Sequence, residues 1–127
     1  MTAPHPAPET VVQRQLDAVN ARDLDGWLAT YAPDAQQFEL PGTLLASGHD
    51  AIRARSAARF ADPALHAKLL QRAVMGHIVI DHEHVTRQLP EGPGYIELVC
   101  IYDVREGLIR TASFAFGPVT PGVLNRD

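Results

Sequence analysis

The sequence predicts an α+β domain, in which helices come first along the chain and an antiparallel sheet follows. Apolar residues recur at helical spacing as far as Phe60, and from Leu65 onward they alternate with polar residues at a period of two. The 127 residues are enough for one domain and too few for two. We therefore expect a single domain over residues 1–127, with an ordered core at about 9–117 and flexible, proline-rich ends.

Two helices are predicted before the first strand. The first is expected to begin at Thr10, and its apolar stripe consists of Val12, Leu16 and Val19. Asp23 is expected to cap a second, short helix. The apolar face of this helix consists of Leu24, Trp27, Leu28 and Tyr31. Because proline cannot continue a helix, we expect Pro33 to end it.

A short strand and a third helix complete the first half. Residues 36–40 alternate polar and apolar like a strand, and Pro41-Gly42 favours a turn after it. The third helix is expected to follow Ser47-Gly48 and to end before Asp62-Pro63.

Four longer strands are predicted in the second half. They cover residues 65–75, 78–89, 95–105 and 108–116. The segments between them are short and contain glycine, which favours tight turns. Consecutive strands should therefore pair as an antiparallel meander, with the helices covering one face of the sheet.

Composition excludes several classes of protein. Lys and Arg number 11 against 15 Asp and Glu, a net charge of -4, so no basic surface is available for nucleic acid or an anionic membrane. One cysteine, Cys100, excludes an internal disulfide and a four-cysteine zinc cluster. The first residues, MTAPHPAP, lack the basic and apolar stretches of a secretion signal, and no run of about 18 apolar residues occurs. We expect a soluble, cytoplasmic protein without a cofactor.

Several short runs in the first half are similar to one family. They are VVQR (11–14), NA (20–21), DLDG (23–26), DA (34–35), SG (47–48) and AIR (51–53). In this order they resemble the N-terminal half of bacterial ketosteroid isomerases, in the nuclear-transport-factor-two-like superfamily that also includes SnoaL-type polyketide cyclases. The resemblance covers about residues 10–117. It implies a cone, in which a curved antiparallel sheet wraps around three N-terminal helices and leaves a deep apolar pocket open at one end.

The resemblance assigns three catalytic positions. Gln15 falls where the family has an oxyanion-hole tyrosine, Glu39 where it has the general-base aspartate, and Cys100 where it has a protonated aspartic acid. Glu39 alone keeps the chemistry of its position, because a thiol is a weak hydrogen-bond donor. We therefore expect little or no ketosteroid isomerase activity.

His82 and His84 enlarge the candidate site. The even positions of strand 78–89 share one face, and the resemblance places that face toward the pocket, with Cys100 and Tyr102 on the next strand. The candidate catalytic residues are Glu39, His82, His84 and Gln15. Such a set is suited to abstracting a proton beside a carbonyl group and supporting the enolate that forms. The expected pocket wall consists of Trp27, Tyr31, Phe60, Cys100, Tyr102 and Phe116.

Each candidate also has a structural alternative. Strict alternation along its strand would turn Glu39 to solvent. His82 and His84 lie in a polar run that also suits a solvated or subunit-contact face. Gln15 fits the pocket floor without a catalytic part, and the mid-strand position of Cys100 favours an inert buried thiol.

A metal site on His82 and His84 is the weaker alternative. A third ligand would have to be Glu39, or else His77 or His66, and His77 and His66 reach the site only if the strands bend. The all-β order and the glycine spacing of metal-binding cupin barrels are absent. We therefore predict no bound metal.

Two classes of function are consistent with these residues. The first is an isomerase, cyclase or lyase-type enzyme that transfers protons on a small hydrophobic substrate, with Glu39 as the candidate base. The second is a non-catalytic module of the same fold that binds a ligand or assembles subunits. In both cases we expect a homodimer, because Val79, Val99 and Ile101 make the outer face of the sheet apolar.

Overall fold

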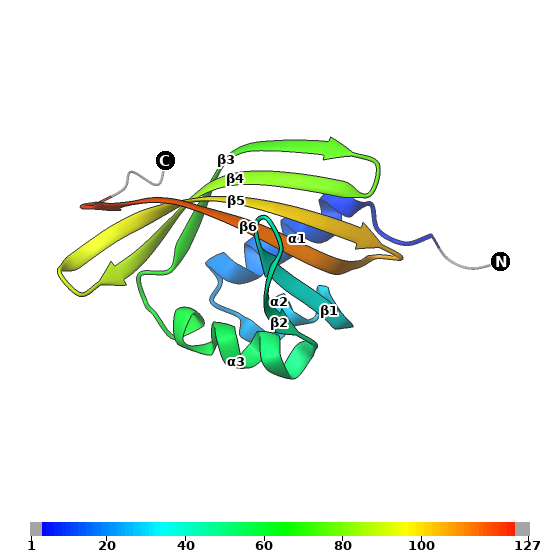
Figure 1. The fold of residues 1–127 in the computed structure, drawn as a ribbon, viewed down its shortest axis with the longest axis horizontal. Helices are drawn as coiled ribbons and strands as arrows, with labels where there is room; N and C mark the ends of the chain where they lie inside the picture. The colour runs from blue at the N-terminus through cyan, green and yellow to red at the C-terminus, as the bar shows by residue number, and fades with distance from the viewer. Residues whose placement is uncertain (1–3, 124–127) are drawn as a thin grey trace.

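The structure is a computed structural model that describes residues 4–123, and these form three helices and one six-stranded sheet (Figure 1). The helices are α1 (Pro8–Asn20), α2 (Leu24–Leu28) and α3 (His49–Phe60). The strands are β1 (Tyr31–Glu39), β2 (Thr43–Ser47), β3 (His66–Met75), β4 (Ile78–Leu89), β5 (Gly92–Arg105) and β6 (Leu108–Pro121). The predicted α+β class, with a curved sheet and three helices, is confirmed.

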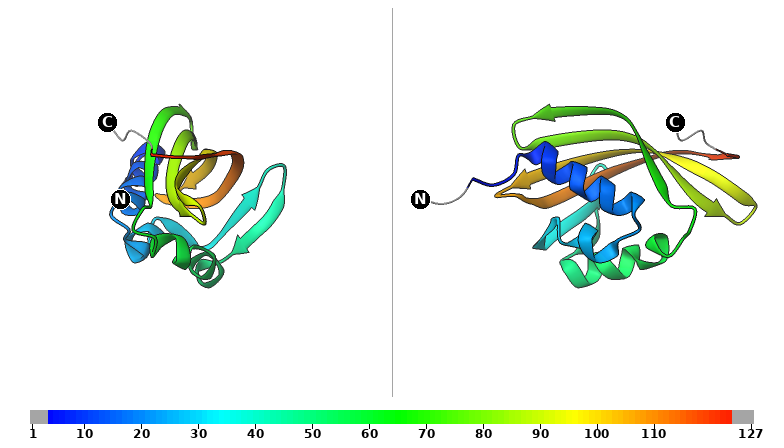
Figure 2. Two further views of the ribbon diagram at one scale, coloured as in Figure 1. Left: turned by 90° about the vertical axis from the view of Figure 1, so that its left-hand side faces the viewer. Right: turned by 180° about the vertical axis from the view of Figure 1, so that it is seen from behind.

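The strands follow the order β2-β1-β6-β5-β4-β3 across the sheet. Strands β3 to β6 pair antiparallel in sequence order, which confirms the predicted meander. Strand β1 pairs with β6 in parallel and forms a hairpin with β2, a strand that was not predicted. Figure 2 shows the sheet curling, with α1 crossing its inner face and α3 below it. The sheet and the helices thus enclose the interior of the domain.

The helix starts follow local chain chemistry. Helix α1 begins at Pro8, before the predicted cap at Thr10, because the fixed φ of proline suits a first helical turn. Asp23 caps α2 as predicted, and its carboxylate accepts a hydrogen bond from the Gly26 N–H at 2.9 Å. No helix among residues 4–123 is long and apolar enough to cross a membrane.

Tyr31 is the first residue of β1. Its helical spacing from Trp27 and Leu28 had predicted that it would belong to the second helix. It belongs to the strand because the sheet already holds the chain here, where the Ile109 N–H of β6 donates to the Thr30 carbonyl at 2.9 Å. The ring of Tyr31 still packs on Trp27, with centroids 4.9 Å apart, and Phe60 packs on Trp27 at 5.1 Å. These three rings connect the helices to the sheet in the core.

The last two strands are longer than predicted. Strand β5 begins at Gly92 and β6 continues to Pro121, so the turn after β4 shortens to Pro90-Glu91. The added length pairs within the sheet, where Gly94 lies opposite Pro121. Prolines in this stretch had favoured an earlier end, but the outer part of a long hairpin tolerates them.

Candidate functional site

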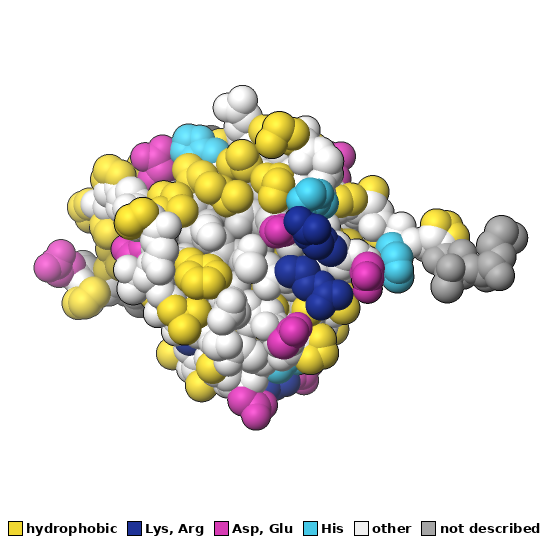
Figure 3. Space-filling view, turned by 45° about the vertical axis from the view of Figure 1, so that its right-hand side comes forward, with side chains coloured by type: hydrophobic (Ala, Val, Ile, Leu, Met, Phe, Trp, Pro, Cys, Tyr) yellow, Lys and Arg dark blue, Asp and Glu magenta, His cyan; other side chains and the backbone are white. Residues whose placement is uncertain are grey.

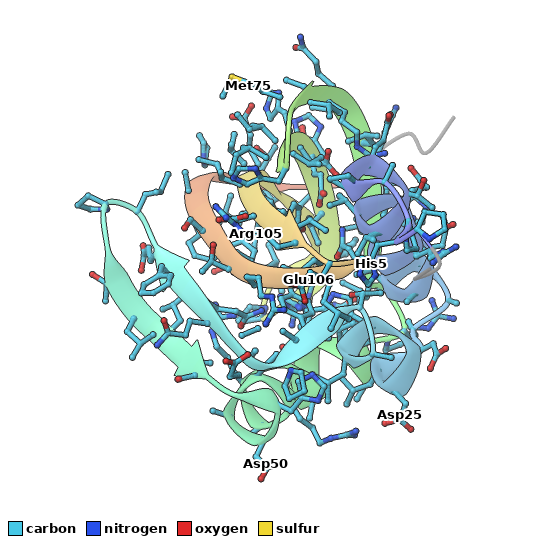
Figure 4. All side chains as sticks on the ribbon, turned by 90° about the vertical axis from the view of Figure 1, so that its right-hand side faces the viewer. His5, Asp25, Asp50, Met75, Arg105 and Glu106 are labelled. Atoms are coloured by element: carbon cyan, nitrogen blue, oxygen red, sulfur yellow. The ribbon has the colours of Figure 1, made fainter. Side chains whose placement is uncertain are left out.

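A cavity of about 50 Å³ lies between the inner face of the sheet and the helices. Figure 4 views the molecule from the end at which Arg105 closes β5 and Glu106 begins the turn to β6, with the sheet curling over the side chains inside. The wall is mainly apolar, and its polar members are Gln15, Tyr31, Arg59, Glu83, Cys100 and Tyr102. Since one water needs roughly 10–15 Å³, the cavity has room for a small ligand group.

Glu83 is the acidic group of this cavity. It lies on β4, is only 4% exposed, and its Oε2 atom has no hydrogen-bond partner among the described residues. Burial raises the pKa of Glu83 to about 7, and the negative charge of Asp81 adds to this shift. A carboxyl group with such a pKa is present in both protonation states at neutral pH, as a general acid or base requires.

Asp81, two residues earlier on the same face, is fully paired. Arg72 of β3 donates to both of its carboxylate oxygens, at 2.7 and 2.9 Å. A further donor of Arg72 binds the side-chain oxygen of Gln13 at 2.9 Å. The hydrogen bonds to Asp81 raise the pKa of Arg72. This guanidinium is therefore occupied by Asp81, and Oε2 of Glu83 stays without a partner in the described part of the chain.

Three protonated groups share the cavity wall with Glu83. Burial raises the pKa values of Tyr31, Cys100 and Tyr102 well above their usual range. The Tyr31 hydroxyl accepts a hydrogen bond from the Gln37 side chain at 3.4 Å. Both tyrosines are thus neutral hydroxyl groups, and Cys100 is a buried neutral thiol.

Gln15 and Arg59 supply N–H donors. The side-chain oxygen of Gln15 accepts from the Trp27 indole at 3.1 Å, which fixes the amide and leaves its NH₂ group without a partner among the described residues. Arg59, at the end of α3, lies over the rings of Trp27 and Phe60, 5.5 Å from each centroid. The cavity therefore combines one carboxyl group with amide, guanidinium and hydroxyl donors.

The structure brings five of the predicted residues together in the cavity wall: Gln15, Trp27, Tyr31, Cys100 and Tyr102. Phe60 is buried against Trp27 but does not line the cavity. Phe116 is 47% exposed, and Phe114 takes the place predicted for it. Phe114 is the aromatic residue of β6 that lies opposite Cys100, so it shares the inner face of the sheet.

Glu39 lies apart from this group. It is exposed at the end of β1, opposite Thr43 of β2, and it does not line the cavity. The predicted position inside the pocket is therefore wrong. Its ladder neighbour in β6, Phe114, lines the cavity, but Glu39 is the last residue of β1 and its side chain stays exposed.

The predicted inward orientation of His82 and His84 is also wrong. On β4 the odd positions are the buried ones, and Asp81, not His82, lies opposite Cys100 in the ladder. Directly opposite residues of an antiparallel pair point to the same face, so both histidines lie on the outer face. There, Nε2 of His82 is 2.6 Å from a carboxylate oxygen of Glu97.

The outer histidines have separate ring contacts. The ring of His84 packs on Tyr95, with centroids 4.9 Å apart, and lies 6.4 Å from the ring of His82. Within residues 4–123, no group of three or more His, Cys, Asp or Glu side chains is placed to hold a metal ion.

Glu83 and Arg59 were missed as site residues. Glu83 is one residue from both predicted histidines, and pairing β4 with β5 through Asp81 and Cys100 would have found it. Arg59 had no comparable signal, because an arginine near a helix end more often lies in solvent.

The chain matches the SnoaL-like domain family over residues 12–112. No curated protein matches it. Among solved structures, the epoxide hydrolase/cyclase-like enzyme SalBIII, linked to pyran ring formation in salinomycin, superposes with a TM-score of 0.79 at 15% identity, over 89% of this chain and 94% of that one. A Sinorhizobium meliloti protein proposed to be a polyketide cyclase gives a TM-score of 0.67 at 27% identity, over 83% and 93% of the two chains.

A third structure was solved with a ligand. RV0760c from Mycobacterium tuberculosis, in complex with estradiol-17β-hemisuccinate, gives a TM-score of 0.72 at 20% identity, over 86% of this chain and 93% of that one. These likenesses extend over most of each chain and support the fold expected from the sequence. The match to the family covers most of the chain, and the protein therefore belongs to the SnoaL-like domain family, with the nuclear-transport-factor-two-like fold that it shares with ketosteroid isomerases.

Proposed function

We propose that this protein is an enzyme that binds a small, largely apolar molecule in its cavity and transfers a proton on it, in an isomerisation or cyclisation. The observation that carries the proposal is Glu83, a buried carboxyl group in a mainly apolar wall, whose Oε2 has no hydrogen-bond partner within residues 4–123. A pKa of about 7 lets this group take up and return a proton at neutral pH. Membership of a family that includes polyketide cyclases is consistent with this chemistry.

The proposed step begins at a carbon atom beside a carbonyl group. The Glu83 carboxylate takes the proton from this carbon, and the electron pair of the broken C–H bond moves to the carbonyl oxygen as an enolate. Donors that could stabilise the enolate are the Gln15 amide and the Tyr102 hydroxyl, both in the cavity wall. Return of the proton from Glu83 to another carbon gives an isomer, and no oxidant is needed.

The experiment follows exchange of carbon-bound protons in heavy water by NMR. Acetylacetone and a small β,γ-unsaturated ketone serve as probes, because both carry acidic C–H bonds beside a carbonyl group. We expect the wild type to accelerate exchange and Glu83→Gln to lose about a hundredfold or more of that acceleration, since loss of a general base has this magnitude. Glu39→Gln is the matched control and should keep the wild-type rate, because Glu39 is outside the cavity. Full activity in Glu83→Gln would refute the role of this residue.

The second candidate function is a non-catalytic ligand-binding module. The exposed position of Glu39 favours it, because the residue that corresponds to the family's general base does not line the cavity. The same NMR samples separate the two candidates. Saturation-transfer signals from a bound probe, without any acceleration of exchange in the wild type, would identify a binding protein.

We further infer a homodimer that forms through the outer face of the sheet. Ile80 and Ile101 are cross-strand neighbours there, Leu70 is 41% exposed, and Val99 is partly exposed. Val79, predicted on this face, is instead buried inside. Figure 3 shows hydrophobic side chains gathered over the upper part of the molecule, with Lys and Arg concentrated toward one end. Sedimentation velocity at micromolar concentration should show a dimer, and a monomer would contradict the inference.

A further inference from the structure

Arg59 places a positive charge in the cavity wall without a polar partner. It lies in the last turn of α3, and its half-buried side chain lines the cavity. Within residues 4–123, no group accepts a hydrogen bond or forms an ion pair with its guanidinium. Several other arginines are paired, as Arg53 is with Asp25 at 2.6 Å and Arg72 with Asp81 at 2.7 Å.

Two aromatic rings hold Arg59 in place. The guanidinium carbon is 5.5 Å from the ring centroids of both Trp27 and Phe60. Such contacts use the face of the guanidinium, so its five N–H donors remain without an acceptor among the described residues. Burial lowers the pKa of Arg59, but an arginine in a protein keeps its charge. A charged donor group that has left much of its water without gaining an acceptor is therefore poised to bind one.

Glu83 is not that acceptor. No Arg59 nitrogen lies within 4.0 Å of a carboxylate oxygen in the described part of the chain, although the charge of Arg59 opposes the rise in the pKa of Glu83. The two groups line the same cavity without touching. An acid and a cation held apart in this way leave room for a ligand that contacts both.

We propose that the ligand of this cavity is an organic anion, whose carboxylate or enolate oxygens bind Arg59 while its apolar part lies against the wall that includes Trp27 and Phe114. This inference rests on the proposed function and names the substrate class for it. The planar guanidinium matches two oxygens of a carboxylate or of a conjugated enolate with two parallel hydrogen bonds. Where the anion is a carboxylate, the acidic C–H bond of the same molecule would then lie toward Glu83; an enolate that binds Arg59 corresponds to the product of proton removal.

The cavity favours a single negative charge and a small molecule. Only one cation, Arg59, lines it among the described residues, and an ionised Glu83 repels further negative charge. A volume of about 50 Å³ is below the roughly 150 Å³ of a protein cavity known to bind benzene. A larger acid can enter if the Arg59 side chain moves outward. Among the described residues, the guanidinium is held by its contacts with the Trp27 and Phe60 rings and by no hydrogen bond, so this movement breaks no hydrogen bond.

The test compares acids with neutral molecules of nearly the same shape. Crotonate and crotonamide, and benzoate and benzamide, are titrated into the wild-type protein by calorimetry at about pH 6, where Glu83 is largely protonated. We expect each acid to bind about tenfold or more tightly than its amide, because charge-assisted bidentate bonds are about twice as strong as neutral ones. Arg59→Met should abolish this preference and keep the affinity for the amides. Arg53→Met, on the exposed side of the same helix, is the control and should behave as the wild type.

The outcomes separate this inference from the proposed function. Equal affinity for acids and amides in the wild type, or a preference for acids that survives in Arg59→Met, would overturn the inference and leave the proton-transfer proposal standing. Absence of binding by all four probes, and by acetylacetone, would overturn both. If Arg59→Met fails to fold, Arg59→Lys tests the same point, because it keeps the charge, loses the planar donors and should reduce the preference without removing it.

Discussion

Titratable groups lie on both faces of the sheet at β4, and the two faces give them opposite surroundings. On the outer face, His82 is paired with Glu97 at 2.6 Å, with side-chain exposures of 36% and 41%. On the inner face, Glu83 is 4% exposed and Asp81 is fully buried. The outer pair has good geometry but little desolvation, and the inner acids have lost their water.

The inner face itself divides into a paired and an unpaired acid. Arg72 neutralises Asp81 with two hydrogen bonds, whereas Oε2 of Glu83 has no partner among the described residues. Burial alone therefore does not make a reactive group. A buried acid becomes chemically available when its neighbours leave it unpaired, and here the Arg72 guanidinium is committed to Asp81.

The largest effect is expected from breaking the buried ion pair. Arg72→Met leaves Asp81 charged and unpaired at a fully buried position. We expect the free energy of unfolding to fall by about 3–5 kcal/mol, as is found when one partner of a buried pair is removed. Urea unfolding followed by circular dichroism measures the change.

The double variant Arg72→Met with Asp81→Asn is the control for this pair. It removes the uncompensated charge, so it should recover part of the lost stability. A loss of less than about 1 kcal/mol in Arg72→Met would mean that solvent reaches Asp81 and that the contrast with Glu83 is overstated.

A smaller, pH-dependent effect is expected at the unpaired acid. The pKa of Glu83 is about 7 in the folded protein against 4.5 for an ordinary glutamate, so the folded state binds its proton more tightly than the unfolded chain does. Stability should therefore fall as pH rises from about 4.5 to about 7, by roughly 3 kcal/mol in total, because one unit of pKa shift corresponds to about 1.4 kcal/mol.

Glu83→Gln carries no charge and should lose this pH dependence. Its free energy of unfolding should exceed that of the wild type above neutral pH, with a difference that shrinks toward pH 4.5. The groups that face or act on Glu83 are Asp81, Arg72, Arg59, Tyr31 and the β5 pair Cys100 and Tyr102. Since the tyrosines and the thiol stay neutral over this range, a pH slope that persists in Glu83→Gln would assign the titration to another group.

The sequence reveals features that are set locally along the chain, and it does not reveal which face of β4 is buried. The order of elements follows from local periodicity and from caps such as Asp23, and the resemblance correctly placed Gln15 and Cys100 in the cavity wall. Which side chains of β4 point into the interior depends on the strand register, and hydrogen bonds to β5 set that register. Because side chains alternate along a strand, a shift of one residue exchanges Glu83 with His82, and apolar residues on both faces of β4 give no local signal for the choice.

The positions of Glu39 and Arg59 relative to the cavity could not be predicted from local sequence patterns either. An ungapped correspondence placed Glu39 in the pocket, but its side chain is exposed at the end of β1 and does not line the cavity, although its β6 neighbour Phe114 does. Arg59 reaches the cavity because the end of α3 packs against Trp27, a contact between segments 32 residues apart in the sequence (59 minus 27). Such long-range contacts leave no periodic pattern in either segment.

The smallest effect is expected on the outer face. A double-mutant cycle with His82→Ala and Glu97→Gln should give a coupling energy of no more than about 1 kcal/mol, because both side chains are more than a third exposed and water screens their interaction. Neither variant should change the affinity for benzoate, since both residues lie outside the cavity wall. A coupling well above 1 kcal/mol would indicate that this face is buried in solution. In that case the cycle is repeated across a dilution series that dissociates the proposed dimer, and the coupling energy should fall to no more than about 1 kcal/mol in the monomer. A coupling energy that stays high in the monomer would show that burial of this pair does not depend on dimer formation.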